Sequence, residues 1–284
     1  MKHLKILILL CFTVGLISCS SSDDSEDNPT TITGNYFPSM LSDQWIYNVI
    51  NESDVDPAGN FTGTDLLTVA SESGTNFTLD VNNGTSPASG TFNALLVNGI
   101  LTRTDSELTY NGTFVMPPGF EDIFNQDIVL NNLFLYDLNA SNNDVLSTVS
   151  DVITQDLVVG GETFPLTINY ELKTIYSGYS ASETVDGVSY SNVVKTKFVL
   201  NISVSTEIVV VVPTEISILD SQDVLTIDTF YAEDIGLIKA DSQSGYQLSN
   251  EITALSGPPF NIDLGFPESG TSSNIQELDS YFLN

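Results

Sequence analysis

The chain has 284 residues, and its 37 acidic residues outnumber its 7 lysines and arginines, which gives a formal net charge of −30. Such a charge repels polyanions, and the few basic residues form no patch that could release counterions from a phosphate backbone, so nucleic acid is excluded as a partner. His3 is the only histidine, and the two cysteines, Cys11 and Cys19, also lie near the N-terminus.

The first 18 residues have the pattern of a secretory signal peptide. Lys2 and Lys5 precede an apolar stretch at 6–17, and a polar, acidic segment follows that stretch. A helix that spans a bilayer needs roughly 20 apolar residues, so this shorter stretch is expected to target the chain without spanning. We therefore assign 1–18 to a lipoprotein signal peptide.

Residues 16–19, with the sequence LISC, resemble the lipobox of bacterial lipoproteins, which implies that Cys19 is acylated and becomes the first residue of the mature chain. Cys11, the one possible disulfide partner, lies in the segment that is removed. The mature chain then has no histidine and no free thiol. This excludes Ser-His-Asp and Cys-His catalysis in their usual forms, together with disulfides and zinc sites made of Cys and His.

The segment that follows Cys19 is too polar and too charged to fold by itself, so 19–34 is expected to be an acidic, flexible tether. Its acidic run at 23–27 resembles the export signal of Bacteroidota lipoproteins, which sends them to the outer face of the outer membrane. A plain spacer is the alternative interpretation. The resemblance implies an outer-membrane protein that is exposed on the cell surface and attached to the membrane through its lipid.

The loop at 54–65 is the closest approach to a metal motif. Asp54, Asp56 and Asp65 take positions one, three and twelve of a calcium-binding loop, and calcium prefers oxygen ligands. Ala58 replaces a ligand, however, and an aspartate is shorter than the glutamate expected at position twelve. A long hairpin loop is therefore the alternative, and calcium is the one cofactor that the sequence suggests.

Short runs of β-branched and aromatic residues, separated by Asn-Gly, Gly-Gly and Asp-Gly turns, dominate 35–284 and predict one β-rich domain of antiparallel hairpins. In 168–176 the aromatic and aliphatic side chains share one parity. In 194–204 apolar side chains alternate with mostly polar ones, so each stretch is expected to bury one face. The run 208–212 is apolar on both parities, which predicts a strand that is covered on two sides or lines an apolar groove.

The end of the chain has a helical pattern. Ser273 and Gln276 have the spacing of a capping box, and Ile275, Leu278 and Phe282 recur at helical intervals. We therefore expect a short C-terminal helix over 273–283 after the strands.

Two motifs resemble those of uncharacterised secreted β-proteins and lipoproteins from Bacteroidota. Residues 36–38 and 45–47 match the opening motif YFP…W-x-Y, and residues 231–239 match the closing motif YA-x-G-x-G-L-x-K, with Asp234 in place of its first glycine. Residues 186–194 resemble a strand-turn-strand segment of the same proteins. The resemblance implies a curved antiparallel sheet, similar to the half-open barrel of the lipoprotein-carrier fold, and it implies no activity.

Together these features predict an all-β surface lipoprotein with a non-enzymatic binding or envelope-associated role. Two alternatives stay open. A pair of carboxylates could hydrolyse glycosides, with Glu121 and Asp122 in a loop or Glu171 in a strand as candidates. A curved sheet with an apolar cavity could instead carry a hydrophobic ligand. Glycans, hydrophobic ligands and envelope proteins are the possible partners besides the membrane.

Replacement of Cys19 by alanine tests the lipid anchor. The variant is expected to leave the membrane fraction, because the apolar stretch at 6–17 is too short to span a bilayer and the variant would lack the acyl chains that anchor the protein. Cell fractionation followed by immunoblotting measures the distribution. Cys11→Ala is the control, since that residue is expected to be removed with the signal peptide. Membrane retention of the Cys19→Ala protein at the wild-type level would contradict the prediction.

Overall fold

A computed structural model of the chain describes residues 32–54, 57–116, 124, 126–159, 162–209, 213–255 and 267–284. The signal peptide, Cys19 and the tether up to residue 31 lie outside these ranges and stay predictions. The described residues belong to a unit that runs from Ile32 to Asn284. Within them, no helix combines the length and the apolar character that crossing a bilayer requires.

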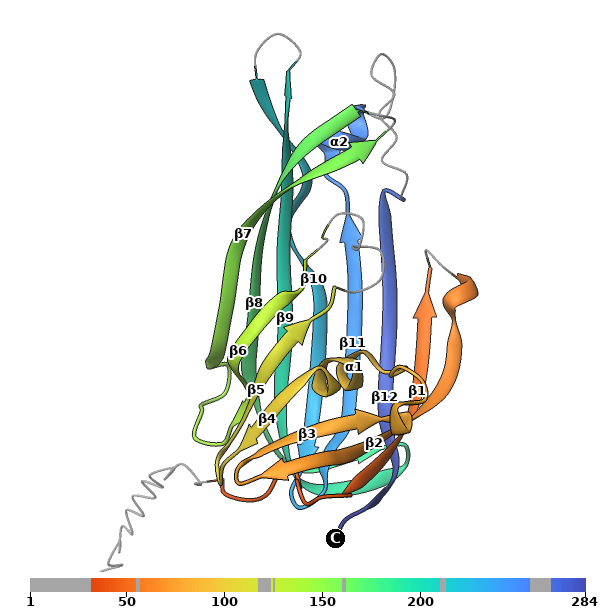
Figure 1. Ribbon diagram of the computed structural model, residues 1–284, viewed down its shortest axis with the longest axis vertical. Helices are drawn as coiled ribbons and strands as arrows, with labels where there is room; N and C mark the ends of the chain where they lie inside the picture. The colour runs from red at the N-terminus through yellow and green to blue at the C-terminus, as the bar shows by residue number, and fades with distance from the viewer. Residues whose placement is uncertain are drawn as a thin grey trace, which may run out of the picture. The chain divides into compact units, whose positions relative to one another are not determined.

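Twelve strands form one antiparallel sheet (Figure 1). The strands are β1 (Gln44–Ser53), β2 (Phe61–Ser73), β3 (Asn76–Val81), β4 (Gly99–Arg103), β5 (Glu107–Phe114), β6 (Ile128–Asp137), β7 (Val145–Val159), β8 (Glu162–Val185), β9 (Val188–Val209), β10 (Pro213–Ala232), β11 (Gly236–Gln247) and β12 (Ser269–Phe282). The helices are α1 (Thr91–Val97) and α2 (Asn250–Leu255), with single 3-10 turns at Pro57–Gly59 and Asn82–Gly84.

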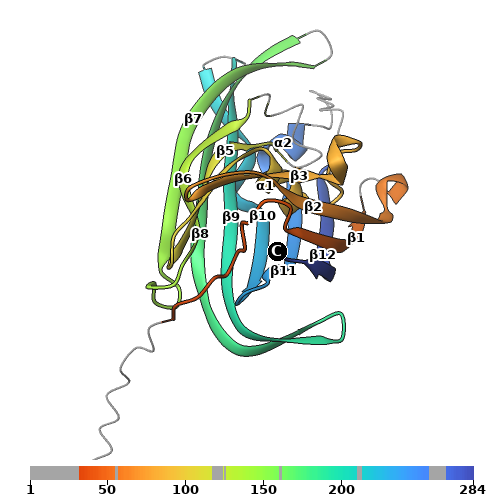
Figure 2. The ribbon, with the colours of Figure 1, turned by 60° about the horizontal axis from the view of Figure 1, so that its bottom comes forward.

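The strand order is β6-β5-β4-β3-β2-β1-β12-β11-β10-β9-β8-β7. Consecutive strands are neighbours except β6 and β7, which form the two edges, and β12 joins the two halves by pairing with β1. The sheet is curved so strongly that its edge strands β6 and β7 approach each other (Figure 2). There the backbone N–H of Phe134 donates to the Ser147 hydroxyl at 2.9 Å. The sheet is therefore a nearly closed, barrel-like structure, which confirms the predicted all-β, curved antiparallel fold.

A short helix does lie near the C-terminus, but at α2 and not over 273–283. The predicted helical segment is strand β12, which pairs with β1 on one side and with β11 on the other. Its buried side chains alternate along the strand and include Asn274 and Gln276. The helical interpretation was wrong because the inward-facing residues Asn274 and Gln276 are polar, so the apolar residues alone, of which only Leu278 is buried, did not mark the buried face.

Strand β9 confirms the alternation predicted for 194–204. Its inward side chains are buried, whereas Lys195 and Lys197 lie on the outer face, where they form ion pairs with Glu183 and Asp228. The stripe predicted at 168–176 also faces the core, on β8. Most of the run 208–212 lies outside the described residues.

The two sequence motifs meet in an aromatic cluster at one end of the sheet. The Phe37 ring lies 5.3 Å from Trp45, 5.7 Å from Phe77 and 6.4 Å from Tyr231, measured between ring centroids. Trp45 Nε1 donates to the Ile235 carbonyl at 2.6 Å. Residues that are about 190 positions apart in sequence therefore form one packed core, which is a structural reason for both motifs.

The turn between β10 and β11 accommodates the unusual aspartate of the closing motif. Asp234 has φ 60°, which is the left-handed conformation that glycine or aspartate adopts with little cost, and its N–H donates to the Asn35 carbonyl at 2.6 Å. Gly236 has φ 106°, and a Cβ there would lie 3.3 Å from Trp45 Nε1. The glycine thus lets the hairpin pack directly against the tryptophan.

Tyr47→Phe tests how much this end of the sheet depends on buried hydrogen bonds. Tyr47 is fully buried, and its hydroxyl donates to the Leu237 carbonyl at 2.9 Å. We expect the variant to lose about 1 kcal/mol of unfolding free energy in urea denaturation. Tyr179→Phe, at an exposed tyrosine that bonds Asn192, should lose less than about 0.5 kcal/mol. Equal losses at the two positions would contradict this.

Candidate functional site

Helix α1 is held inside the curved sheet by a buried carboxylate. Asp65, on β2, is fully buried, and its two oxygens accept the backbone N–H groups of Ser89 and Gly90 at 2.8 Å each. Asn93 on the helix donates its side-chain amide to the same carboxylate at 3.1 Å. The backbone N–H groups at the start of a helix have no partner within the helix, and here those of the two residues just before α1 donate to the Asp65 carboxylate. Strand β2 thereby fixes the position of α1.

Two side chains of β12 complete this clamp. The Asn274 carbonyl oxygen accepts the N–H of Thr91 at 2.9 Å, and the Gln276 carbonyl oxygen accepts the N–H of Phe92 at 2.7 Å. The approach is close at Gly90, where an added Cβ would lie 2.2 Å from Gln276 Cδ. Glycine is therefore required there for space, and α1 begins directly against the inner face of the sheet.

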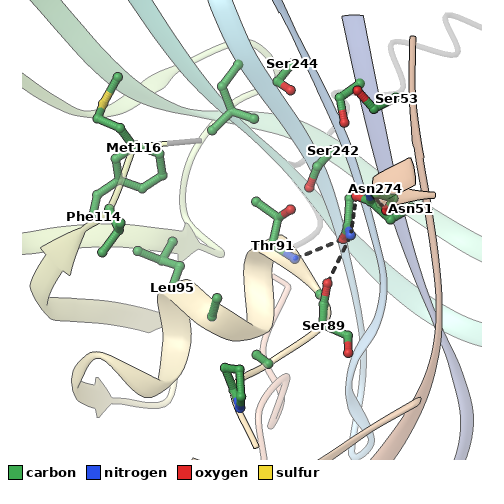
Figure 3. Close-up of a pocket in the computed structure, with 18 of the residues that line it drawn as sticks. Asn51, Ser53, Ser89, Thr91, Leu95, Phe114, Met116, Ser242, Ser244 and Asn274 are labelled. Atoms are coloured by element: carbon green, nitrogen blue, oxygen red, sulfur yellow. Dashed lines mark hydrogen bonds between the residues drawn. The ribbon is translucent and has the colours of Figure 1, made fainter. Parts of the chain in front are cut away.

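A cavity of about 860 Å³ lies between α1 and the inner face of the sheet (Figure 3). Its volume falls in the range of about 300–1,000 Å³ that is typical of small-molecule sites. Its lining residues are Asn51, Ser53, Gly59, Phe61, Ser86, Pro87, Ala88, Ser89, Gly90, Thr91, Ala94, Leu95, Asn98, Phe114, Val115, Met116, Leu225, Ser242, Ser244, Ser272 and Asn274.

One wall of the cavity is a polar block on three adjacent strands. The ladder aligns its members in two rows, because Ser242 on β11 lies opposite Asn274 on β12, and Ser244 lies opposite Ser272. Asn51 and Ser53 of β1 continue these rows. With strands about 4.8 Å apart, each row spans about 10 Å. The polar block consists of Ser242, Ser244, Ser272, Asn274, Asn51 and Ser53.

The facing wall is apolar. It is formed by Leu95 on α1, by Phe114 at the end of β5 and by Met116 just after that strand (Figure 3). On the sheet itself the lining changes from polar to apolar at β10, where Leu225 is the ladder partner of Ser244. The cavity can therefore contact an apolar group on one side and hydrogen-bonding groups on the other.

None of the described lining residues is ionisable, although the whole chain has 37 acidic residues. The described wall therefore offers neither a general acid nor a general base. Phe61 and Val115 are exposed, which marks the side on which the cavity meets solvent. This arrangement can bind an uncharged molecule and shows no catalytic pair.

A second, shallower hollow of about 390 Å³ lies between β9, β10 and α2. It contains Glu215, Asp220 and Glu251. Two of these carboxylates already bind Ser217, because Glu251 accepts its N–H at 2.7 Å and Asp220 accepts its hydroxyl at 2.7 Å. These groups hold the start of α2 against β10, which accounts for the acidic lining.

The structure does not bring Asp54 and Asp65 of the predicted calcium loop together. Asp65 lies opposite Tyr47 in the ladder, whereas Asp54 follows the far end of β1, so the strand rise separates them by about 20 Å. Asp54 instead accepts the N–H and the hydroxyl of Thr271 at 2.7 and 2.9 Å. Asp56 lies outside the described residues, and no described group of three metal-ligating side chains is present.

Of the carboxylates suggested for glycoside hydrolysis, the structure describes only Glu171. Glu171 lies on the outer face of β8 and pairs with Lys173 at 2.5 Å. Glu121 and Asp122 fall outside the described residues.

Buried tyrosines are the other groups that could carry proton chemistry. Burial raises the pKa of the Tyr110 hydroxyl to about 12, and it raises the pKa of Tyr47 and Tyr231 well above the usual range. All three hydroxyls are therefore protonated at neutral pH. None of them lines the cavity, so they serve packing and hydrogen bonding in the core.

The sequence interpretation missed the residues of the cavity. The signal was present in the small polar residues at alternate positions of 242–244 and 272–274, which lie on the inner face of β11 and β12. Small polar residues on an inward parity indicate an interior that is not packed by side chains. The strand assignment of 269–282 was needed to see this, and that segment had been predicted as a helix.

Comparison with known proteins does not identify a family for this chain. No protein-family model and no curated protein matches the chain. A solved structure, the crystal structure of a LolA superfamily protein from Nitrosomonas europaea, is 10% identical and covers 88% of this chain and 89% of its own, with a TM-score of 0.19. A TM-score this low does not show a shared fold, and the functional interpretation rests on the cavity itself.

Asp65→Asn tests the clamp that positions α1. The amide would present a donor to the N–H groups that the carboxylate now accepts, so we expect a loss of about 3 kcal/mol of unfolding free energy. Urea denaturation followed by circular dichroism measures it. Asp105→Asn, in the exposed turn after β4, is the matched control and should change stability by less than about 0.5 kcal/mol. A clamp variant as stable as the control would contradict the assignment.

Proposed function

We propose that this protein is a lipid-anchored, non-enzymatic binding protein of the bacterial cell surface that holds a hydrophobic ligand in the cavity between α1 and the sheet. The observation that carries the proposal is the cavity of about 860 Å³ with an apolar wall and no ionisable side chain among its described lining residues. Pockets of this size with a mostly apolar lining and a few polar groups are the usual form of small-molecule sites.

The lining also distinguishes binding from hydrolysis. Glycoside hydrolysis needs two carboxyl groups on either side of the scissile bond, and the described wall contains none. Ligand binding needs no titratable group. The composition therefore favours a binding role over the carboxylate enzyme for this cavity.

The predicted N-terminus fits a binding role at the membrane. Acylation of Cys19 would attach the protein, and the acidic tether at 19–34 would separate the folded unit from the lipid surface, since charged, polar segments are extended. A tethered domain with such a cavity can take up an apolar molecule at the membrane surface, and the protein itself does not need to span the bilayer. We infer a role in capturing or retaining such molecules at the cell surface.

Ala94→Trp tests the cavity. Ala94 is half-buried on α1 and lines the cavity, so an indole there would occupy the space of the ligand. The mature chain with Cys19→Ala, purified free of lipid, would be titrated with the uncharged fluorescent probe N-phenyl-1-naphthylamine. We expect saturable binding to the parent protein and at least about tenfold weaker binding to the Ala94→Trp variant, since most of the apolar contact is lost.

Ile100→Trp is the matched control, because Ile100 is exposed on β4 and lies outside the lining. Its affinity for the probe should equal that of the parent protein. Thermal unfolding by circular dichroism confirms that each variant is folded. Absence of saturable binding to the folded parent, or equal binding to the two tryptophan variants, would overturn the proposed function.

A further inference from the structure

We infer that the ligand is an uncharged amphiphile with a hydroxyl-bearing head, of the class of acylglycerols, whose head binds the polar block and whose acyl chain lies along the apolar wall. This inference rests on the proposed function and specifies its ligand. Three observations carry it: an unpartnered hydroxyl in the polar block, the two-sided lining, and the lack of charge in the described wall.

Ser242 provides the first observation. Its side chain is buried, with a relative exposure of 2%, and it lines the cavity (Figure 3). Its hydroxyl has no hydrogen-bond partner among the described residues. Buried polar groups in proteins are almost always hydrogen-bonded, so an unsatisfied hydroxyl in a cavity wall indicates a partner that enters the cavity.

The neighbour of Ser242 on β12 is already engaged. Asn274 accepts from Thr91 at 2.9 Å, and its amide donates to the Asn51 carbonyl oxygen at 3.2 Å and to the Ser89 carbonyl at 3.1 Å. Asn274 therefore supports the wall and positions α1. Ser242, directly opposite it in the ladder, is the member of the polar block with a buried, unpartnered hydroxyl, a group that can act as donor or acceptor.

The apolar wall determines where the chain of the ligand lies. Leu95, Phe114 and Met116 face the polar block across the cavity, and Leu225 borders that block on the neighbouring strand (Figure 3). A molecule with separate polar and apolar ends can satisfy both walls at once, whereas a purely apolar molecule would leave the Ser242 hydroxyl unsatisfied. The two-sided lining thus selects an amphiphile, with few polar groups fixing its orientation.

The lack of charged side chains among the described lining residues determines the chemistry of the ligand's head group. A carboxylate or phosphate head would meet no cation among the described lining residues, and the net charge of −30 would repel it on approach. An ammonium head would meet no carboxylate in that wall. Because an unpaired charge is costly to bury, the geometry favours a head that is neutral and forms hydrogen bonds.

The test uses a matched series with one chain length. Monolauroylglycerol is neutral and hydroxylated, laurate is anionic, and dodecyltrimethylammonium is cationic. Each competes for N-phenyl-1-naphthylamine bound to the mature Cys19→Ala chain, at concentrations below those at which it aggregates. We expect monolauroylglycerol to displace the probe at least about tenfold more effectively than either charged compound, because buried hydrogen-bonding groups reject heads that they cannot pair.

Ser242→Ala locates the head. This variant should weaken monolauroylglycerol binding by about three- to tenfold, which corresponds to one hydrogen bond, and it should weaken binding of the fluorescent probe, which has no hydroxyl, by less than about twofold. Ser273→Ala is the control, since Ser273 lies on β12 beside the polar block but outside the lining. It should change neither affinity. Thermal unfolding by circular dichroism shows whether the Ser242→Ala variant is folded.

The outcomes separate the two proposals. If the folded parent protein does not bind the probe, the proposed function fails. If the probe binds but laurate or the ammonium compound competes as well as monolauroylglycerol, the proposed function stands and the uncharged head is refuted. If monolauroylglycerol is preferred but Ser242→Ala binds it like the parent protein, the assignment of the head to Ser242 is refuted.

Discussion

The position of α1 inside the sheet depends on one buried carboxylate. Asp65 accepts hydrogen bonds from the backbone just before the helix and from Asn93 within it, at the point where a helix start has donors without internal partners. A buried charge is tolerated only where such donors surround it. Asn274 and Gln276 of β12 accept the N–H groups of the next two residues, Thr91 and Phe92. Strands β2 and β12 therefore fix the helix together.

The cavity follows from this arrangement. With its first turn tied to the strands, α1 covers only part of the inner face, and its Leu95 side becomes one wall of the space that remains. The opposite wall keeps small uncharged side chains, since Ser242, Ser244 and Ser272 do not fill the volume that larger residues would occupy. The polar residues that hold the helix and the polar residues that line the cavity are thus neighbours on the same strands, and Asn274 serves both purposes.

The end of the sheet that contains the aromatic cluster is closely packed, in contrast to the region of the cavity. Phe37, Trp45 and Tyr231 fill this end, and Gly236 permits the close approach of the β10–β11 turn. The sequence motifs around these residues could be recognised without a structure, but their role could not. These residues stabilise the fold and lie outside the cavity lining. Proteins that share the motifs are therefore expected to share this packing, and the motifs do not indicate a common ligand.

The sequence by itself determined the fold class and the exclusions. Turn dipeptides and period-two patterns such as that of 194–204 follow from local backbone geometry, and the presence of a single histidine, His3, is a matter of composition. Only the tertiary structure decided the site. The spacing of Asp65 suggested a calcium ligand, and strand pairing placed it beneath α1. The apolar residues of 273–283 recur at helical intervals, but that segment is a strand whose inner face includes the polar residues Asn274 and Gln276. The cavity depends on register, which aligns Ser242 and Asn274, on consecutive strands near the end of the chain, with Asn51 on the first strand.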